Sequence, residues 1–378
     1  MPIFDQGYQH WSGELSGHSW RWLAIARHGV RVGMKSSILR LMLLFAWLPA
    51  IGLAFAMSLW GLVEQKSPLI QALLSYLQFL GPEILSDPKS YRVEVWTLCY
   101  SYFLLTELRF SMILILIVGP SLISQDIRFN ALPLYFSRPL RRIDYFLGKL
   151  GVIGYFLGMV LVVPSIVAYV LGLLFSMDMS ILKDTFPLLL ASVAYGLVVT
   201  LSAGLLMLAL SSLSRNSRYI GLFWIGVWFI TSITGNILEL INREQRQHEY
   251  YEKMVAEQMP TKSTNKKLTP QEQKQQNEER NKLFNQLKQK EFEDARSDWR
   301  PLVSYTSNLI RVGDALLGTD KCWERLSLDK PAEARSQYLI NNMAPMHPWQ
   351  WSAFVLLVLF GISVCILNFR VRSLDRLR

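Results

Sequence analysis

Apolar and charged side chains follow one another within one short segment, residues 134–144, and their chemistry suits docking better than catalysis. The segment carries an apolar group followed by charged side chains, namely Leu134, Tyr135, Phe136, Arg138, Arg141, Arg142 and Asp144. Apolar rings can seat in a groove of a partner, and charges set the register of such a contact. The alternative is that the cations only anchor the loop on the positive side of a membrane. The aromatic pair and Pro139 within the same loop favour docking.

No pattern of catalytic or metal-binding residues is present elsewhere. A phosphate-binding loop requires G-x-x-x-x-G-K-[ST], but Gly148-Lys149 is followed by Leu150 and has Ile143 where the first glycine belongs. The three cysteines have no metal-ligand spacing and indicate no disulfide framework. The five histidines form no recognisable Ser/His/Asp order. We therefore expect no enzyme activity and no cofactor in this chain.

Glu107 and Arg109 are the two charged residues that lie most clearly inside a predicted apolar stretch. Ionisable groups are costly in the hydrocarbon, so they mark candidate functional positions. Two residues apart on a helix, they point in different directions and do not pair with each other. Either they line a polar path for a substrate, or they lie near the outer leaflet, paired with other helices or extended toward water.

The composition identifies the solvent that most of the chain meets. Of the 378 residues, 51% are hydrophobic and only 18% are charged, a balance that indicates a membrane protein. The formal net charge of +10 does not indicate nucleic-acid binding, because the basic residues lie beside apolar runs rather than on a polar face. We predict an all-α protein with six transmembrane helices, at 39–63, 97–123, 147–176, 185–211, 218–241 and 350–369.

Basic residues predict the orientation of these helices. Lys and Arg gather before the first span, in every second connection and after the sixth span, which places both termini in the cytoplasm. Trp60, Trp96, Trp349 and Trp351 fall at the predicted outer boundary, where aromatic rings are favoured. The predicted organisation is a cytoplasmic N-terminus at 1–38, spans one to five at 39–241 with a loop at 124–146, an extracytoplasmic insert at 242–349, the sixth span at 350–369 and a cytoplasmic tail at 370–378.

The insert at 242–349 has two halves of different composition. Its first half, to about Asp298, is rich in Glu, Lys, Gln and Asn and has too few apolar residues to bury a core, so we expect a protruding helical hairpin or a partly disordered segment. The second half regains apolar residues such as Leu309 and Trp323. We expect that half to pack as a small cap on the outer membrane surface and to be a candidate site for an extracytoplasmic protein partner.

Residues 20–35 fit a basic amphipathic helix. One face carries Trp22, Leu23, Ala26, Val30 and Met34, whereas Trp20, Ile25 and Val32 blur the pattern. Another face carries Arg27, Arg31 and Lys35. Such a helix lies in the headgroup plane of the membrane with its cations toward anionic lipid, and the alternative is an ordinary cytoplasmic helix.

Small residues recur along spans three and four. Gly154 and Gly158 in span three, and Gly196 and Gly204 in span four, form stripes that let helix backbones approach closely. Packing within one subunit is one explanation of the stripes, and a dimer interface is the other.

The segment from Gly119 to Gly158 resembles the type-2 permease family of ATP-binding-cassette (ABC) transporters. In that family an acidic-basic pair, a short amphipathic segment, a Ser-Arg-Pro element and a Gly-Lys pair follow the second span. This chain has the corresponding residues Asp126, Arg128, Ala131 to Phe136, Ser137, Arg138, Pro139, Arg142, Gly148 and Lys149. Six spans, a basic helix before the first and a large outer segment before the sixth are also similar to that family.

The resemblance implies a permease subunit without a fused ATPase, located in the cytoplasmic (inner) membrane. ATP and Mg²⁺ would bind to cytosolic ABC ATPase subunits, and a second permease copy or a paralogue would complete a path between the two permeases. It adds Asp126, Arg128 and Lys149 to the residues that couple to the ATPase. Two alternatives are a membrane-anchored sensor or scaffold, and a secondary transporter, which the scarcity of intramembrane charges and the lack of an inverted repeat disfavour.

Overall fold

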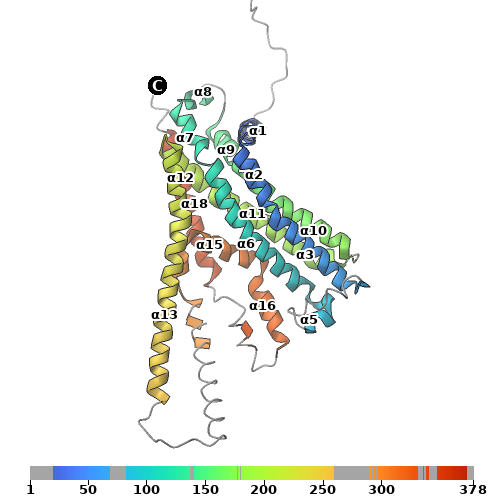
Figure 1. Cartoon of the computed structure of the whole chain (residues 1–378). Coiled ribbons are helices and arrows are strands. Elements are labelled where there is room, and N and C mark those ends of the chain that lie inside the picture. Colours follow the sequence, from blue (N-terminus) through green and yellow to red (C-terminus); the bar gives the residue numbers. More distant parts are fainter. Residues whose placement is uncertain are drawn as a thin grey trace, which may run out of the picture.

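A computed structural model describes residues 20–68, 82–136, 140–176, 178, 180–258, 289–290, 293–294, 296–330, 335, 338–339 and 347–372. All regular structure in these residues is helical. Six helical segments are long and apolar enough to cross a membrane. The predicted all-α fold with six transmembrane helices is therefore confirmed, and the spans run side by side as one bundle (Figure 1).

The six candidate spans are Ser37–Glu64, Pro88–Arg128, Arg142–Ser176, Ser180–Leu213, Ser217–Arg246 and Trp349–Arg370. Each contains the stretch predicted from the sequence and is longer than it, except where the two share a boundary. The reason is that a helix needs apolar side chains only within the hydrocarbon, and its hydrogen bonds continue beyond it.

Several spans consist of more than one helical piece. In chain order the pieces are α2 (Ser37–Ala46) and α3 (Leu48–Glu64), η3 (Pro88–Tyr91), α6 (Arg92–Val118) and α7 (Ser121–Arg128), α9 (Arg142–Leu157), η4 (Gly158–Val162) and α10 (Val163–Ser176), α11 (Ser180–Leu213), α12 (Ser217–Ile225), η5 (Gly226–Ile230) and α13 (Thr231–Gln258), and α18 (Trp349–Arg372). The pieces η4 and η5 are π-helical turns. Pro164 follows η4 and lacks the N–H that a regular helix would need there.

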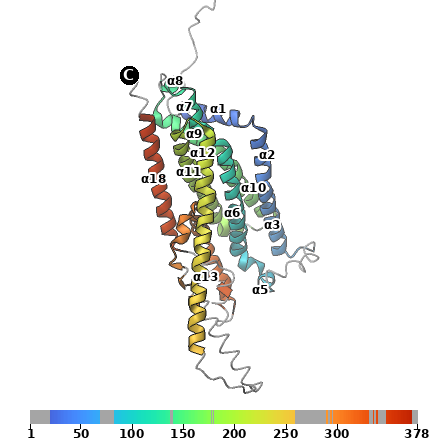
Figure 2. The ribbon, with the colours of Figure 1, turned by 60° about the vertical axis from the view of Figure 1, so that its left-hand side comes forward.

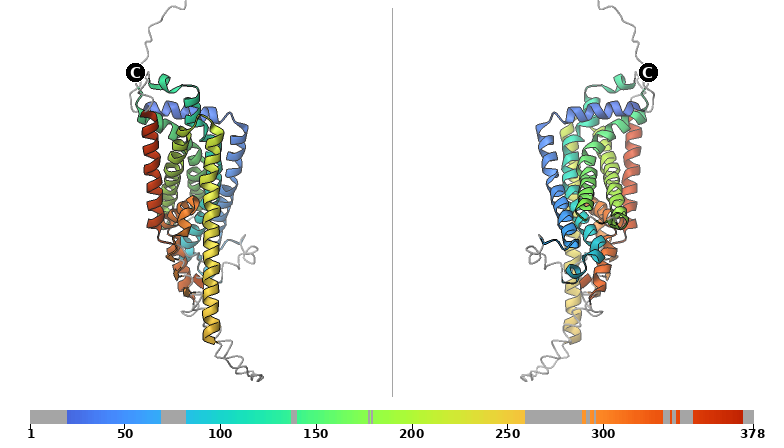
Figure 3. Two further views of the ribbon diagram at one scale, coloured as in Figure 1. Left: turned by 90° about the vertical axis from the view of Figure 1, so that its left-hand side faces the viewer. Right: turned by 90° about the vertical axis from the view of Figure 1, so that its right-hand side faces the viewer.

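Helix α1 (Arg21–Gly33) lies across one end of the bundle (Figure 3), as a helix in the headgroup plane would. It packs on α9, where a Cβ atom at Gly148 would stand only 2.7 Å from the Cβ atom of Ile25. Leu23, on the predicted apolar face, is 44% exposed. The face that packs on α9 includes Ile25, because Gly148 leaves room there for its branched side chain.

Buried side chains from all six spans form one hydrophobic core in the bundle. The ring of Trp96 meets that of Tyr169 edge-on, with 5.6 Å between the centroids, and is fully buried. Trp60 is buried as well. Trp60 and Trp96 are thus turned into the bundle, whereas Trp349 and Trp351 are 45% and 40% exposed. The depth of the four rings in the membrane stays a prediction. Period and position in the sequence do not distinguish an interfacial ring from one turned inward.

The fifth span continues far past the bundle. Figures 1 and 2 show α13 extending beyond the other helices at the end opposite to α1, α7 and α8. The chain then returns along it, where the carboxylate of Asp298, 5% exposed, lies 3.3 Å from the Arg246 guanidinium and accepts a hydrogen bond of 2.7 Å from Asn242. The predicted protrusion corresponds to α13, and residues 259–288 lie outside the described part of the chain.

The segment after this return enters the bundle. It forms η6 (Arg300–Val303), α15 (Tyr305–Leu317) and α16 (Thr319–Leu328). A separate short helix, α5 (Pro82–Ser86), precedes the second span. Tyr305 is buried, its hydroxyl lies 3.0 Å from the Ser202 hydroxyl, and its ring meets that of Trp224 at 6.2 Å. Thus α15 begins among spans rather than as a cap on their outer surface. The buried Asn308 amide nitrogen finds acceptors there, donating to the Leu302 and Ser304 carbonyls.

Candidate coupling surface

The segment between spans two and three folds into two short helices at the end of the bundle. Helix α7 is anchored at its start, where the Ser211 hydroxyl accepts hydrogen bonds from the backbone amides of Ile123 and Ser124, each 3.1 Å long, and donates to the Pro120 carbonyl. Asn130, at φ +50°, turns the chain into α8 (Leu132–Phe136). These contacts fix α7 to the end of α11, so the loop is not free to move by itself.

One cluster joins α7, α8 and α9. The ammonium of Lys149 lies 2.6 Å from the carboxylate of Asp126, and the Tyr145 hydroxyl donates to the same oxygen at 2.7 Å. Lys149 also lies over the rings of Tyr135 and Tyr145, at 5.9 and 5.4 Å from their centroids. Burial, with the Asp126 charge adding to it, raises the pKa of the Tyr135 phenol, so this ring stays neutral. An ion pair and two aromatic rings thus hold the loop against span three.

The rest of the predicted docking residues lie around this cluster. Leu134 is 71% exposed on the outer side of α8. At the start of α9 the Arg141 amide donates to the Asp144 carboxylate at 3.2 Å, which caps the helix. The side chain of Phe136, and all of Arg138 and Pro139, lie outside the described residues.

A basic cleft of about 570 Å³ lies beside the cluster. It is lined by Arg128 of α7 and by the turn from α11 to α12, with Arg215, Asn216, Ser217 and Arg218. From the sequence, the two arginines of the turn indicated only membrane orientation. The structure brings them to Arg128, so two connections of the chain share one cationic surface. We name the combined surface of α7, α8, the start of α9 and this cleft the coupling surface.

Glu107 and Arg109 occupy opposite environments on α6. Glu107 is fully buried, and neither of its carboxylate oxygens has a hydrogen-bond partner among the described residues. The Ser111 hydroxyl, one turn away, lacks a partner there too. Arg109 is exposed on the outer surface of the subunit. The two side chains therefore point apart, as their spacing predicts.

The small residues of spans three and four face different surroundings. A Cβ atom at Gly196 would stand 2.8 Å from Val162, one at Gly204 would stand 2.7 Å from Leu150, and one at Gly154 would stand 3.4 Å from Thr200. These three therefore pack within the subunit. Gly158, by contrast, faces open space.

An ion-pair network at the opposite end of the bundle has no counterpart in the sequence predictions. The Arg92 guanidinium, 3% exposed, lies 2.7 Å from the carboxylate of Glu64, 3.1 Å from Asp178 and 3.4 Å from Asp184. The backbone amide of Ser180, together with Arg92, holds the pKa of Asp178 below its ordinary value. All four charged residues flank predicted spans at one membrane boundary, and that shared position is the sequence feature from which the network could have been inferred.

The fold and this surface define a class: a polytopic helical membrane protein whose basic connections form a compact surface at one end. No group of three or more His, Cys, Asp or Glu side chains suited to a metal ion is found where the chain is described. Residues 23–308 match the family model of ABC-2 family transporter proteins, and the chain belongs to that family. It is thus a multi-pass membrane transport permease of the ABC-2 type. A search of curated proteins finds no match to the chain.

Proposed function

We propose that this permease is one subunit of an ATP-driven exporter in the cytoplasmic (inner) membrane, with both termini in the cytoplasm. A separate cytosolic ABC ATPase binds ATP and Mg²⁺ and docks on the coupling surface, so this chain itself has no enzyme activity. A second permease copy or a paralogue completes the transport path. ABC-2 permeases generally work with such an ATPase, which supports the partner class.

The observation that carries this proposal is the attachment of α7, which leads into α8, to spans three and four. Lys149 of α9 holds Asp126 of α7, and Ser211 of α11 holds the start of α7. A force applied to α8 would therefore reach spans two, three and four together. Helix α1 packs on α9 and would move with it. A loop that served only as a topological anchor would need none of these contacts.

The chemistry of the coupling surface defines the partner surface. Leu134 and Phe129 are each 71% exposed and suit an apolar groove. Arg128 lies over the Phe129 ring and lines the basic cleft together with Arg215 and Arg218, which suits a carboxylate-rich rim. The ATPase surface that docks here should therefore combine a hydrophobic groove with acidic residues.

Arg109 supports a second permease on the outer face of α6. It is exposed within a span, and no hydrogen bond or ion pair joins it to the described residues. An arginine in the middle of a span is costly against lipid and favours a neighbouring protein or a polar path. We place the second permease, with the path between the two, against this face.

The test is copurification of the ATPase with the full-length permease. Replacing Tyr135, Phe136, Arg141 and Arg142 together with Ala should abolish it, and Leu134→Glu should weaken it, because the groove would have to accept a charge. Arg40→Ala, at the same end of the bundle but on α2, should leave it unchanged. Unchanged copurification of the four-residue variant would rule out the docking role, and transport by the permease alone would rule out the ATP-driven function.

A further inference from the structure

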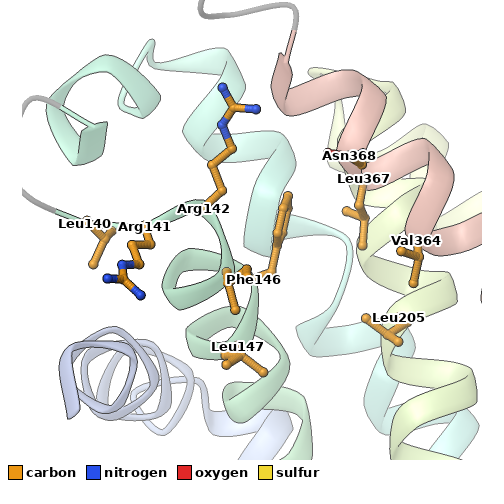
Figure 4. A pocket seen from close by; sticks show the side chains of 10 residues that line it. Leu140, Arg141, Arg142, Phe146, Leu147, Leu205, Val364, Leu367 and Asn368 are labelled. Atoms are coloured by element: carbon orange, nitrogen blue, oxygen red, sulfur yellow. The ribbon is translucent and has the colours of Figure 1, made fainter. Parts of the chain in front are cut away.

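A second cleft, of about 750 Å³, opens between three spans near the coupling surface. Its lining residues are Leu140, Arg141, Arg142, Ile143, Phe146, Leu147, Leu205, Val364, Leu367 and Asn368. Figure 4 shows Phe146 and Leu147 of α9 on one side and Val364 and Leu367 of α18 on the other, with Leu205 of α11 at the bottom. Helices α9 and α18 each pack on α11 and leave the cleft between them.

The deeper walls of this cleft are apolar and belong to segments that cross the membrane. Val364 and Leu147 are 43% and 44% exposed, so the cleft opens sideways to the surrounding lipid. Protein interiors are close-packed, and a gap of this size at a lipid-facing surface must be filled. Whatever fills it must be apolar along most of its length.

The mouth of the cleft is cationic. Arg142 stands above Phe146 at the opening, whereas Arg141, which also lines the cleft, points its side chain away from Val364 and Leu367 (Figure 4). Arg370, just beyond Asn368 on α18, donates to the Leu213 carbonyl at 3.2 Å at the same end of the bundle. The occupant must therefore carry an anionic group at one end of its apolar part.

The dimensions favour a lipid chain over a helix of a partner. An α-helix with its side chains is about 11 Å across, so a cleft of this volume would hold only about one and a half turns of it. An acyl chain is much thinner and can follow the groove from the mouth to Leu205. We propose that the cleft is a binding site for an anionic phospholipid, with its phosphate at Arg142 and an acyl chain against Phe146, Leu205 and Val364.

The test measures lipid binding to the purified full-length permease by native mass spectrometry. The probes are phosphatidylglycerol and phosphatidylcholine with the same acyl chains. The wild type should bind phosphatidylglycerol preferentially. Arg142→Gln should weaken phosphatidylglycerol binding about fivefold, the value expected for one basic residue at an anionic headgroup, and leave phosphatidylcholine binding unchanged. Arg40→Gln is the control for charge lost elsewhere at this end.

A second pair of variants tests the apolar wall. Val364→Trp fills the cleft from its exposed edge and should abolish the preferential binding of phosphatidylglycerol. Leu357, also on α18, is 67% exposed and lies outside the cleft, so Leu357→Trp should leave this binding unchanged. Unchanged binding by the Val364 variant, or an equal loss of both lipids in the Arg142 variant, would overturn the proposal. Displacement of the lipid by excess glycerol 3-phosphate would also overturn it, since the acyl chain would then be dispensable. A wild-type dimer that Val364→Trp dissociates would identify a second copy as the occupant instead.

Discussion

Lys149 is held by three groups at once, and this explains why a basic residue can be almost buried at the start of a span. Its side chain is 10% exposed, and its partner Asp126 is 15% exposed. The rings of Tyr135 and Tyr145 cover part of the ammonium, and the Tyr145 hydroxyl completes the coordination of the carboxylate. Neither charge can lose its partner cheaply, because water reaches the pair only in part.

This pair gives a first prediction at the scale of residues. Asp126→Ala and Lys149→Met each leave an opposite charge unmatched, and each should lower the free energy of unfolding by about 2 kcal/mol. The double variant should lose less than the sum of the two, with a coupling energy of about 1–3 kcal/mol. Thermal unfolding of the purified permease measures this. Lys183→Met, an exposed cation, is the control, and strictly additive losses would contradict a direct pair.

Glu107 gives a prediction of the opposite sign. Burying a carboxyl group without hydrogen bonds destabilises a protein whether the group is charged or neutral. Glu107→Met, which keeps the side-chain length, should therefore raise the free energy of unfolding by about 1–3 kcal/mol. Glu239→Met, at an exposed position of α13, should change it by less than about 0.5 kcal/mol.

The same Glu107 variant should transport less well than the wild type in proteoliposomes that contain the ATPase. Costly intramembrane carboxyl groups are kept where function requires them, so stability and transport should change in opposite directions. A loss of stability in Glu107→Met would show that the carboxyl group has a stabilising partner instead.

Single residues were predictable from sequence only where a pattern fixed their neighbours. Asp126 and Lys149 were selected because the order of residues around them resembles a known family, but that order does not contain the contact of either with Tyr145. Arg92 and Glu64 were missed because their partners are far apart in the sequence and no local pattern joins them.

At the scale of elements, glycines determine how closely the helices approach. Gly204 lies where α11 meets α9, and a Cβ atom there would stand 2.7 Å from Leu150, closer than side chains tolerate. A Cβ atom added at Gly158, on the neighbouring span, would meet no other atom within 4 Å. The two glycines therefore form a matched pair with opposite expectations.

We expect Gly204→Val to lower the free energy of unfolding by about 1–3 kcal/mol, because the added side chain must displace Leu150 and Ile153 from their packed positions. Gly158→Ala should have no effect or stabilise by up to about 1 kcal/mol, because alanine favours the helix and meets no atom. Melting temperatures of the purified variants decide this. Equal destabilisation by both substitutions would mean that the face of Gly158 is covered, for example by a second permease.

Elements were predictable to the extent that the membrane dictates them. Apolar length identified all six spans, because a helix must supply about 20 apolar residues to cross the hydrocarbon. The position of α15 was not predictable, because the contacts of Tyr305 with Ser202 and Trp224 depend on side chains more than eighty positions distant along the chain being brought together. For the same reason the place of Ile25, which blurs the amphipathic pattern of α1, could not be predicted: its partner, Gly148, belongs to another element.

At the scale of the whole molecule, the two ends of the bundle differ in charge and in shape. Helix α1, the coupling surface and the end of α18 share one end (Figure 1). The arginines that line the two clefts lie at this end. The other end carries the Arg92 network, in which carboxylates outnumber the cations, and the protruding part of α13. Positive charge is retained on the cytoplasmic side of membrane proteins, so this asymmetry supports the proposal that the coupling surface faces the cytoplasm.

Cysteine labelling in intact cells tests this assignment directly. In a variant without the native cysteines, Glu249→Cys on the protruding part of α13 should react with a membrane-impermeant maleimide added from outside. This position is exposed and lies past the end of the fifth span at Arg246. Asn216→Cys, exposed in the basic cleft, should react only after the membrane is permeabilised. The reverse pattern would place the coupling surface outside, where no ATP is supplied, and the ATPase could not reach it. Labelling of both positions from the same side would mean that the fifth span does not cross the membrane.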